Sequence, residues 1–237
     1  MKLGLAVTML DEDHNVAQTL QKVGEEFTAI AVAQSGGEES ELTEILSKHQ
    51  CATHICLPDL DTRSEEDQAG DGERFDIGAR AQSRNYSAAF EWLVDNCGDL
   101  DFAVGIHGDT AIIHTHGIHW VVEKMNASKA GIGVSRAMGQ SLHSAELTRE
   151  QMADPDHPKG GRMQDESNMD FMPQFFVATG NTLPFLAQIK VTNPWCMEQC
   201  IGDAIKGHVG QFVFAQNAYD FSDGIFYHTP SPKGWKH

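Results

Sequence analysis

A histidine and an aspartate two residues apart are the first feature of this 237-residue sequence that suggests chemistry. His107 and Asp109 follow an apolar run, 102–106, whose length and β-branched content predict a buried strand. Residues two apart on an extended chain project to the same side, and Gly108 between them lets the backbone pass close to a ligand. An imidazole and a carboxylate on one side of a turn can hold a divalent cation. An ordinary turn after a strand is the alternative interpretation of the same residues.

The histidines that follow offer a second grouping of possible metal ligands. On an extended strand, His114 and His116 would point to one side and could join His107 and Asp109 in a zinc or iron site. If the same segment begins a helix, the side chains of His114 and His116 diverge. A histidine-rich metalloenzyme is therefore one alternative, which stoichiometric zinc or iron in the purified protein would identify.

The elements that must position these residues alternate between strands and helices. Apolar runs of strand length occur at 3–10, 28–33 and 51–57. Between them, 13–27 and 38–49 have the apolar spacing of helices. This order predicts a parallel sheet with right-handed crossovers, covered by helices. Open α/β sheets bind their ligands at the carboxyl ends of such strands, where His107 and Asp109 are expected.

Further elements are expected on both sides of the His107–Asp109 turn. A helix over 78–94 precedes it, with an apolar face made of Tyr86, Phe90, Leu93 and Val94. After it we expect a helix over 116–127, a strand over 130–134, an apolar run over 171–178, helices over 182–189 and 194–207, and strand-like aromatic spacing over 212–227. The polar segments 59–77 and 141–170 are predicted to be loops.

Composition narrows the classes of protein to consider. A hydrophobic fraction of 41% argues against disorder, and a formal net charge of -17 argues against nucleic acid as a partner. No apolar run approaches the roughly 18 residues that a membrane-spanning helix needs. Five scattered cysteines predict a reducing, cytoplasmic environment without a disulfide framework. Cys196 and Cys200 are read as two half-buried thiols rather than as zinc ligands.

Two short motifs, placed in this order of elements, resemble the GT-A fold glycosyltransferases, and in particular the family-2-like enzymes. Arg84-Asn85 lies in the helix before the strand that ends in His107-Gly108-Asp109-Thr110. In that family a helix bearing Arg-Asn precedes a strand ending in an Asp-x-Asp-type motif, which some branches write as His-Ala-Asp-Thr. The resemblance covers about 3–135 by order of elements and reaches the end of the chain more loosely.

The resemblance implies a fold and an activity. The fold would be an α/β three-layer sandwich with a mostly parallel central sheet. It would be one GT-A-like domain over 1–237, with a nucleotide-binding half, 1–135, and an acceptor-side half, 136–237. The activity would be metal-assisted transfer of a sugar from a nucleotide-sugar donor to a hydroxyl acceptor, with Mn²⁺ or Mg²⁺ as cofactor. The sequence does not name the sugar, the acceptor or the oligomeric state.

The resemblance also assigns five residues to the nucleotide. Thr8 and Asp11, at the end of the first strand, would lie near the base and ribose. Ser35 follows the second strand, in a Gln-Ser-Gly-Gly turn where the family commonly has an Asp-rich one, so the identity of the base stays open. Arg84 would approach the diphosphate, and Asn85 would hold the local turn.

The remaining assignments concern the metal and the catalytic base. Asp109 matches the second carboxylate of the family's motif and His107 replaces the first, which favours Mn²⁺ over Mg²⁺. His228 resembles a histidine that some members use on the metal or the diphosphate. Glu198 is the candidate base, because Gln199 stands where the family's catalytic Asp belongs. That departure leaves a catalytically degenerate nucleotide-binding protein on the same fold as the other alternative.

Overall fold

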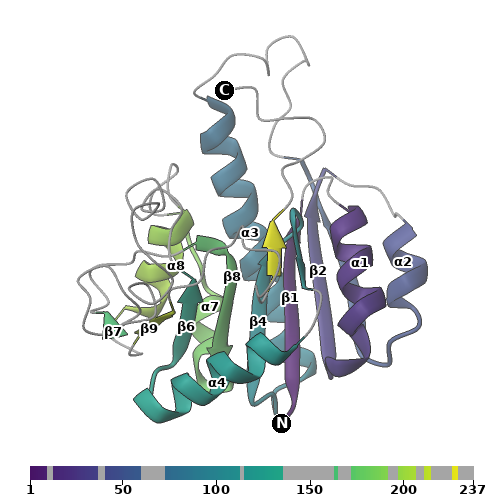
Figure 1. The fold of residues 1–237 in the computed structure, drawn as a ribbon. Helices are drawn as coiled ribbons and strands as arrows, with labels where there is room; N and C mark the ends of the chain where they lie inside the picture. Colours follow the sequence, from purple (N-terminus) through teal and green to yellow (C-terminus); the bar gives the residue numbers. More distant parts are fainter. Residues whose placement is uncertain are drawn as a thin grey trace.

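A mostly parallel β-sheet with helices on both faces is the framework of this protein (Figure 1). The computed structural model describes residues 1–9, 13–36, 41–59, 73–112, 115–135, 163–164, 172–191, 197–206, 211–214 and 226–228. The strands of the large sheet are β1 (Leu3–Met9), β2 (Ala29–Ser35), β3 (Ala52–Leu57), β4 (Phe102–His107), β6 (Ile132–Ser135), β7 (Met163–Gln164), β8 (Met172–Thr179) and β9 (Gln211–Phe214). Within the described residues they lie in the order β3-β2-β1-β4-β8-β6-β9-β7.

The amino-terminal half of the sheet is parallel, as the alternating order predicted. β1 pairs in parallel with both β2 and β4, and β2 pairs in parallel with β3. β8 runs antiparallel between β4 and β6. A second, two-stranded sheet joins β5 (Thr110–Ile112) to β10 (Phe226–His228) in antiparallel register. The expected α/β three-layer sandwich with a mostly parallel central sheet is confirmed.

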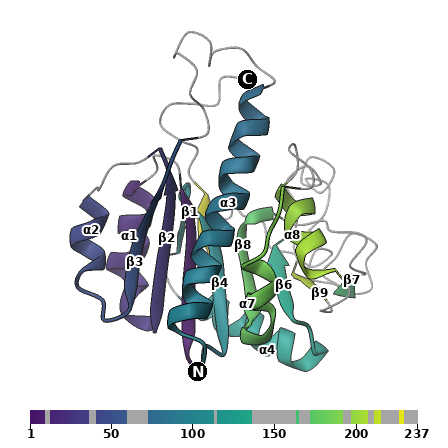
Figure 2. The same cartoon turned by 180° about the vertical axis from the view of Figure 1, so that it is seen from behind.

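Two layers of helices cover the large sheet. They are α1 (Asp13–Val23), α2 (Glu41–Leu46), α3 (Glu73–Asn96), α4 (His116–Ser128), α7 (Leu183–Leu186) and α8 (Met197–Ile205), with 3₁₀ turns at Gly24–Glu26 and Gly180–Thr182. One face carries α1, α2 and α4, and the other carries α3, α7 and α8 (Figures 1 and 2). Neither layer contains, within the described residues, a helix long and apolar enough to cross a membrane.

Successive side chains of β1 point to opposite faces of the sheet, so this one strand contributes to the apolar core on each side. Leu3, Leu5 and Val7 are buried beneath α1, α2 and α4. Ala6, between them, is buried on the side of α3, α7 and α8, and so are the aromatic rings of Tyr86 and Phe90 on α3. A strand buried on both faces reads as a continuous apolar run, and this is why β1, β2 and β4 were found from sequence.

Several predicted boundaries are corrected. The helix predicted to begin at residue 78 begins at Glu73, so the predicted loop 59–77 is shorter; its residues 60–72 lie outside the described part. The first turns of α3 project beyond the ends of the strands (Figure 2). The helix predicted over 182–189 is reduced to α7 after a 3₁₀ turn. Of the predicted loop 141–170, only 163–164 is described, and it forms β7.

Candidate functional site

The turn after β4 lies between the two sheets. His107 ends β4 and is the register partner of Thr8 on β1. The Gly108 amide donates to the Thr8 carbonyl over 2.7 Å, which fixes the turn beside the end of β1. The chain then enters β5, where Thr110 is the register partner of His228 on β10. The backbone of His228 is therefore brought next to the predicted metal motif from the far end of the sequence; its side chain lies outside the described residues.

His107 and Asp109 differ in exposure. Their side chains are 5% and 15% exposed, and His107 Nδ1 lies 3.9 Å from Asp109 Oδ1. The Thr110 hydroxyl donates to the same Asp109 oxygen over 3.3 Å. The imidazole packs against the ring of Tyr86, with 5.7 Å between ring centroids. Asp109 is thus the better placed of the two to meet a cation arriving from solvent.

The side chain of Tyr86 packs in the core and also interacts electrostatically with Asp109 in this turn. Burial raises the pKa of its phenol well above the ordinary value, and the negative charge of Asp109 raises that pKa further. The helical spacing of α3 predicted Tyr86 only as part of an apolar face. Its proximity to Asp109 depends on the packing of α3 across β1 and β4, which no local sequence signal encodes.

A second polar cluster joins α3 to the ends of β1 and β2. The Asn85 side chain is fully buried and donates from Nδ2 to the Met9 carbonyl over 3.0 Å. Asn85 Oδ1 accepts from the Ser35 hydroxyl over 2.8 Å. Arg84 Nη2 donates to Ser35 Oγ over 2.8 Å and also to the Pro58 carbonyl after β3. One side chain from α3 thus holds the ends of β1 and β2, and its neighbour holds the ends of β2 and β3.

Two further features shape the surroundings of Arg84. Burial lowers the pKa of its guanidinium and the charge of Asp59 opposes that shift, so the side chain stays cationic. Gly36 follows Ser35 with φ +71°, a left-handed conformation, and a Cβ there would lie 3.1 Å from the Asp59 side chain. The turn therefore needs glycine at this position so that β2 can end close to Asp59.

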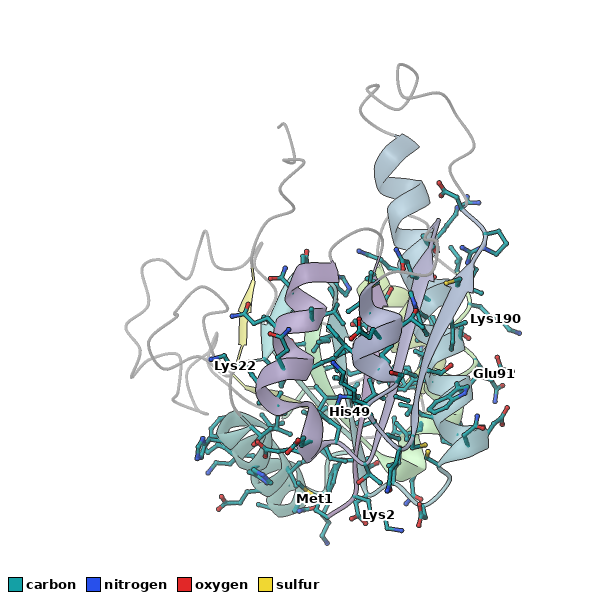
Figure 3. All side chains as sticks on the ribbon, turned by 90° about the vertical axis from the view of Figure 1, so that its right-hand side faces the viewer. Met1, Lys2, Lys22, His49, Glu91 and Lys190 are labelled. Atoms are coloured by element: carbon teal, nitrogen blue, oxygen red, sulfur yellow. The ribbon has the colours of Figure 1, made fainter. Side chains whose placement is uncertain are left out.

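A groove of about 440 Å³ borders Arg84 on the outer side of α3. Its lining residues come from β3, α3 and the segment after α7: Leu57, Arg80, Arg84, Ser87, Ala88, Glu91, Ile189 and Val191. Glu91 and Lys190 lie along this flank of the molecule (Figure 3). Arg84 belongs to both the groove and the polar cluster, and Leu57 brings the end of β3 to the groove.

The structure brings together most, but not all, of the predicted site residues. Thr8, Ser35, Arg84, Asn85, His107 and Asp109 come from β1, β2, α3 and the turn after β4, all at the carboxyl edge of the parallel strands. Thr8 is buried, and its hydroxyl donates to the Gln82 carbonyl over 3.4 Å. Asp11 lies outside the described residues.

The two late positions are placed by backbone only. Glu198 and Gln199 lie in the first turn of α8, close to the predicted start of that helix, and their side chains are not among the described ones. For the histidine-rich alternative, His116 begins α4 and is exposed, while His114 and Cys196 lie outside the described residues. Among the side chains that are described, no group of three or more His, Cys, Asp or Glu could hold a metal ion.

Comparisons with known proteins place this fold. No protein-family model matches the sequence, and no curated protein matches it. Among solved structures, the mannosyltransferase PcManGT from Pyrobaculum calidifontis, in complex with GDP-Man and Mn²⁺, matches 93% of this chain with a TM-score of 0.54 and 8% identity. TarS from S. aureus, in complex with UDP, matches 98% of it with a TM-score of 0.50 and 10% identity. The chain spans 58% and 62% of those two chains, respectively. The protein has the GT-A fold of the nucleotide-diphospho-sugar transferases.

Proposed function

We propose that this protein transfers a sugar from a nucleotide-sugar donor to a hydroxyl acceptor, assisted by a divalent cation. The observation that carries the proposal is the position of Ser35, Arg84, Asn85 and Asp109 along one edge of the sheet, at the carboxyl ends of the parallel strands. Open α/β sheets bind ligands at this edge. The GT-A fold supports the same assignment, since one structure that shares it holds UDP and another holds GDP-Man and Mn²⁺.

The two polar clusters are spaced suitably for a nucleoside diphosphate. Arg84 and Ser35 lie at the ends of β2 and β3, whereas Asp109 follows β4. Three strand spacings separate β3 from β4, on the order of 14 Å. A base and ribose would lie near Thr8, Asp11 and Ser35, and the diphosphate would lie between Arg84 and Asp109.

Arg84 retains a donor for that ligand. Its Nη2 is used by Ser35 and Pro58, but its Nε is buried and has no hydrogen-bond partner among the described residues. A buried cationic donor without an acceptor is costly, and a phosphate oxygen would satisfy it. The role proposed for Arg84 is therefore a charge-assisted hydrogen bond to the donor's diphosphate.

The residues present fit a divalent cation in part. Asp109 supplies a hard carboxylate oxygen, and His107 Nδ1 lies 3.9 Å from that carboxylate. His228, which the register places beside Thr110, is the third proposed ligand. Mg²⁺ and Mn²⁺ sites commonly take only a few protein ligands and complete their coordination with phosphate oxygens and waters, so a sparse protein set is sufficient. When bound, the cation would neutralise the charge that develops on the departing diphosphate.

The chain's own residues would carry the rest of the reaction. The acceptor oxygen forms a bond to the anomeric carbon while the bond from that carbon to the diphosphate oxygen breaks. We propose that Glu198, in the first turn of α8, takes the proton of the acceptor hydroxyl. Arg84 would hold the diphosphate in place, so that the anomeric carbon faces the acceptor.

A calorimetric titration with UDP, GDP, CDP and dTDP, each with and without Mn²⁺, tests the proposal. We expect manganese-dependent binding of one nucleotide. Asp109→Ala should weaken that binding by about 100-fold, because it removes the partly exposed carboxylate of the site. The matched control is Asp101→Ala: Asp101 precedes the same strand, β4, at its other end, and should leave binding unchanged.

The other outcomes are informative. Binding of a nucleotide without hydrolysis or transfer of the sugar would favour the degenerate binding protein, for which Gln199 is the sequence argument. Absence of binding across the panel would contradict the proposed site, and stoichiometric zinc or iron in the same preparation would favour a metalloenzyme. Unaltered binding by Asp109→Ala would show that the cation is held elsewhere.

A further inference from the structure

Two cysteines far apart in the sequence meet at the end of the sheet opposite the candidate site. Cys51 immediately precedes β3, and Cys97 immediately follows α3. Their sulfur atoms are 2.8 Å apart, although the two residues are 46 positions apart along the chain. Two thiol sulfurs in ordinary van der Waals contact lie farther apart than this. Formation of a disulfide bond would shorten the distance to about 2.05 Å. The two sulfur atoms are therefore already close enough for a bond to form between them with little movement of the chain.

The backbone on both sides of the pair is fixed by hydrogen bonds. The Ile30 amide donates to the Cys51 carbonyl over 2.9 Å, and the Cys97 amide donates to the Leu93 carbonyl over 2.9 Å. Both cysteines are half-buried and pack against the same apolar cluster as Tyr86 and Phe90. The short distance is thus imposed by the packing of α3 and β3 rather than by two mobile side chains.

We propose that Cys51 and Cys97 are a disulfide-forming pair that closes when the protein meets a disulfide oxidant such as oxidised glutathione. The Cys51 thiolate attacks oxidised glutathione and releases one glutathione thiol. The Cys97 sulfur then attacks the mixed disulfide at the Cys51 sulfur and releases the second. Two protein thiols lose two protons and two electrons, and one molecule of oxidised glutathione becomes two of reduced glutathione.

The order of these steps follows from the surroundings of Cys97. Burial, and then the hydrogen bond with Cys51, raise the pKa of the Cys97 thiol to about 12. Cys97 therefore remains protonated at neutral pH and is a poor first nucleophile, which leaves the first attack to Cys51. Closure is expected to be slow, and in a reducing environment excess reduced glutathione keeps the pair reduced. A pair that stays reduced in a reducing environment is compatible with the expectation, from the scattered cysteines, that the protein has no disulfide framework.

The bond would tie down the edge of the sheet. Among the described strands, β3 pairs only with β2, and its side chains are partly exposed. A link from its first residue to the end of α3 restricts the unfolded chain across a long loop. We expect the melting temperature to rise by about 5–10 °C. The candidate site should be unaffected, because Arg84 lies midway along α3, several turns from Cys97, and Pro58 follows the other end of β3.

The test compares the wild-type protein in reduced glutathione with the same protein after equilibration with oxidised glutathione. After oxidation, alkylation under denaturing conditions should label three of the five cysteines, and non-reducing digestion should release one cross-linked peptide containing Cys51 and Cys97. Cys56→Ser is the matched control, because Cys56 is exposed on the same strand and its loss should leave the cross-link and the rise in melting temperature intact. Cys97→Ser should abolish both.

Three results would overturn the proposal: labelling of all five cysteines after oxidation, glutathione retained on Cys51 or Cys97, or a cross-link between other cysteines. If Cys97→Ser fails to fold, the peptide map of the oxidised wild-type protein decides the question alone. None of these results depends on the proposed transferase activity.

Discussion

The two ends of the large sheet are held together in different ways. At the carboxyl end, the buried side chains of Ser35 and Asn85 bond to each other, and Asn85 bonds to the Met9 carbonyl. At the amino end, Lys2 pairs with Asp99 on the surface, near Met1 in Figure 3. A hydrogen bond removed from a buried cluster leaves its partners desolvated and unpaired, whereas water replaces a lost surface ion pair.

This difference between the two ends of the sheet predicts which substitutions affect ligand binding as well as folding. The amino end is closed mainly by main-chain hydrogen bonds, such as the 2.7 Å bond from the Thr28 amide to the Leu3 carbonyl. Such bonds survive side-chain substitution. The carboxyl end depends on side chains that also border the proposed ligand. Substitutions there should affect both ligand binding and folding, while those at the amino end should affect neither strongly.

The largest effect is expected for Asn85→Ala. The change leaves the Met9 carbonyl and the Ser35 hydroxyl without their Asn85 partners in a fully buried position. The free energy of unfolding should fall by about 2–4 kcal/mol. Urea denaturation monitored by circular dichroism would measure the loss, and nucleotide titration should show weaker binding as the ends of β1 and β2 separate.

Asn96→Ala is the matched control for that variant. Asn96 is the last residue of α3, is exposed, and donates to the Trp92 carbonyl over 2.9 Å. Its loss should cost less than about 0.5 kcal/mol, since water replaces the donor. Equal destabilisation by the two variants would show that burial of the Asn85 cluster is not what distinguishes the two ends.

An intermediate effect is expected for Arg84→Ala. Removing the guanidinium frees the Pro58 carbonyl, which is near the surface, and leaves the buried Ser35 hydroxyl its bond to Asn85, so stability should fall by only about 1 kcal/mol. Binding of the nucleotide should weaken by about 10-fold or more, because a charge-assisted hydrogen bond to the diphosphate is lost. Arg80→Ala, one turn earlier on the same helix and exposed, should leave both quantities unchanged. Unaltered binding by Arg84→Ala would remove Arg84 from the proposed site.

Elements buried on both faces were predictable from sequence because burial imposes continuous apolar runs. β1, β2 and β4 were found in this way, and so was the helix expected over 116–127, which is α4 with Ile118, Val121, Val122 and Met125 buried. The first turns of α3 and the reversal of β8 were not predictable. The former project beyond the ends of the strands (Figure 2), and the latter is set by pairing with β4 and β6, which are distant in the sequence.

The candidate site likewise contains residues that could be predicted from sequence and contacts that could not. The His107–Asp109 turn was identified because its residues are contiguous and follow a buried strand. Tyr86 beside Asp109, and the bonds from Arg84 to Ser35 and Pro58, arise from long-range packing of α3 on the sheet. A single sequence carries no local signal for such contacts. The meeting of Cys51 and Cys97 was missed for the same reason.

The smallest effect on stability is expected from loss of the surface ion pair between Lys2 and Asp99, at the amino end of the sheet. The hydrogen bond from Lys2, and then its charge, hold the pKa of Asp99 below its ordinary value of 3.8; the same pair raises the pKa of Lys2 above 10.5. The contribution of Asp99 is therefore present above pH 3.8 and is lost as the pH falls through its lower folded-state pKa. That of Lys2 is present below pH 10.5 and is lost only above it.

Across the neutral range, then, stability should not depend on pH through this pair. Asp99→Asn should leave the free energy of unfolding unchanged within error at physiological salt, because exposed pairs are screened and contribute little. An NMR titration of the Asp99 carboxyl in the wild-type protein would check the lowered pKa directly. A loss of stability as large as that of Asn85→Ala would mean that the amino end also depends on its side chains, and the distinction between the two ends would fail.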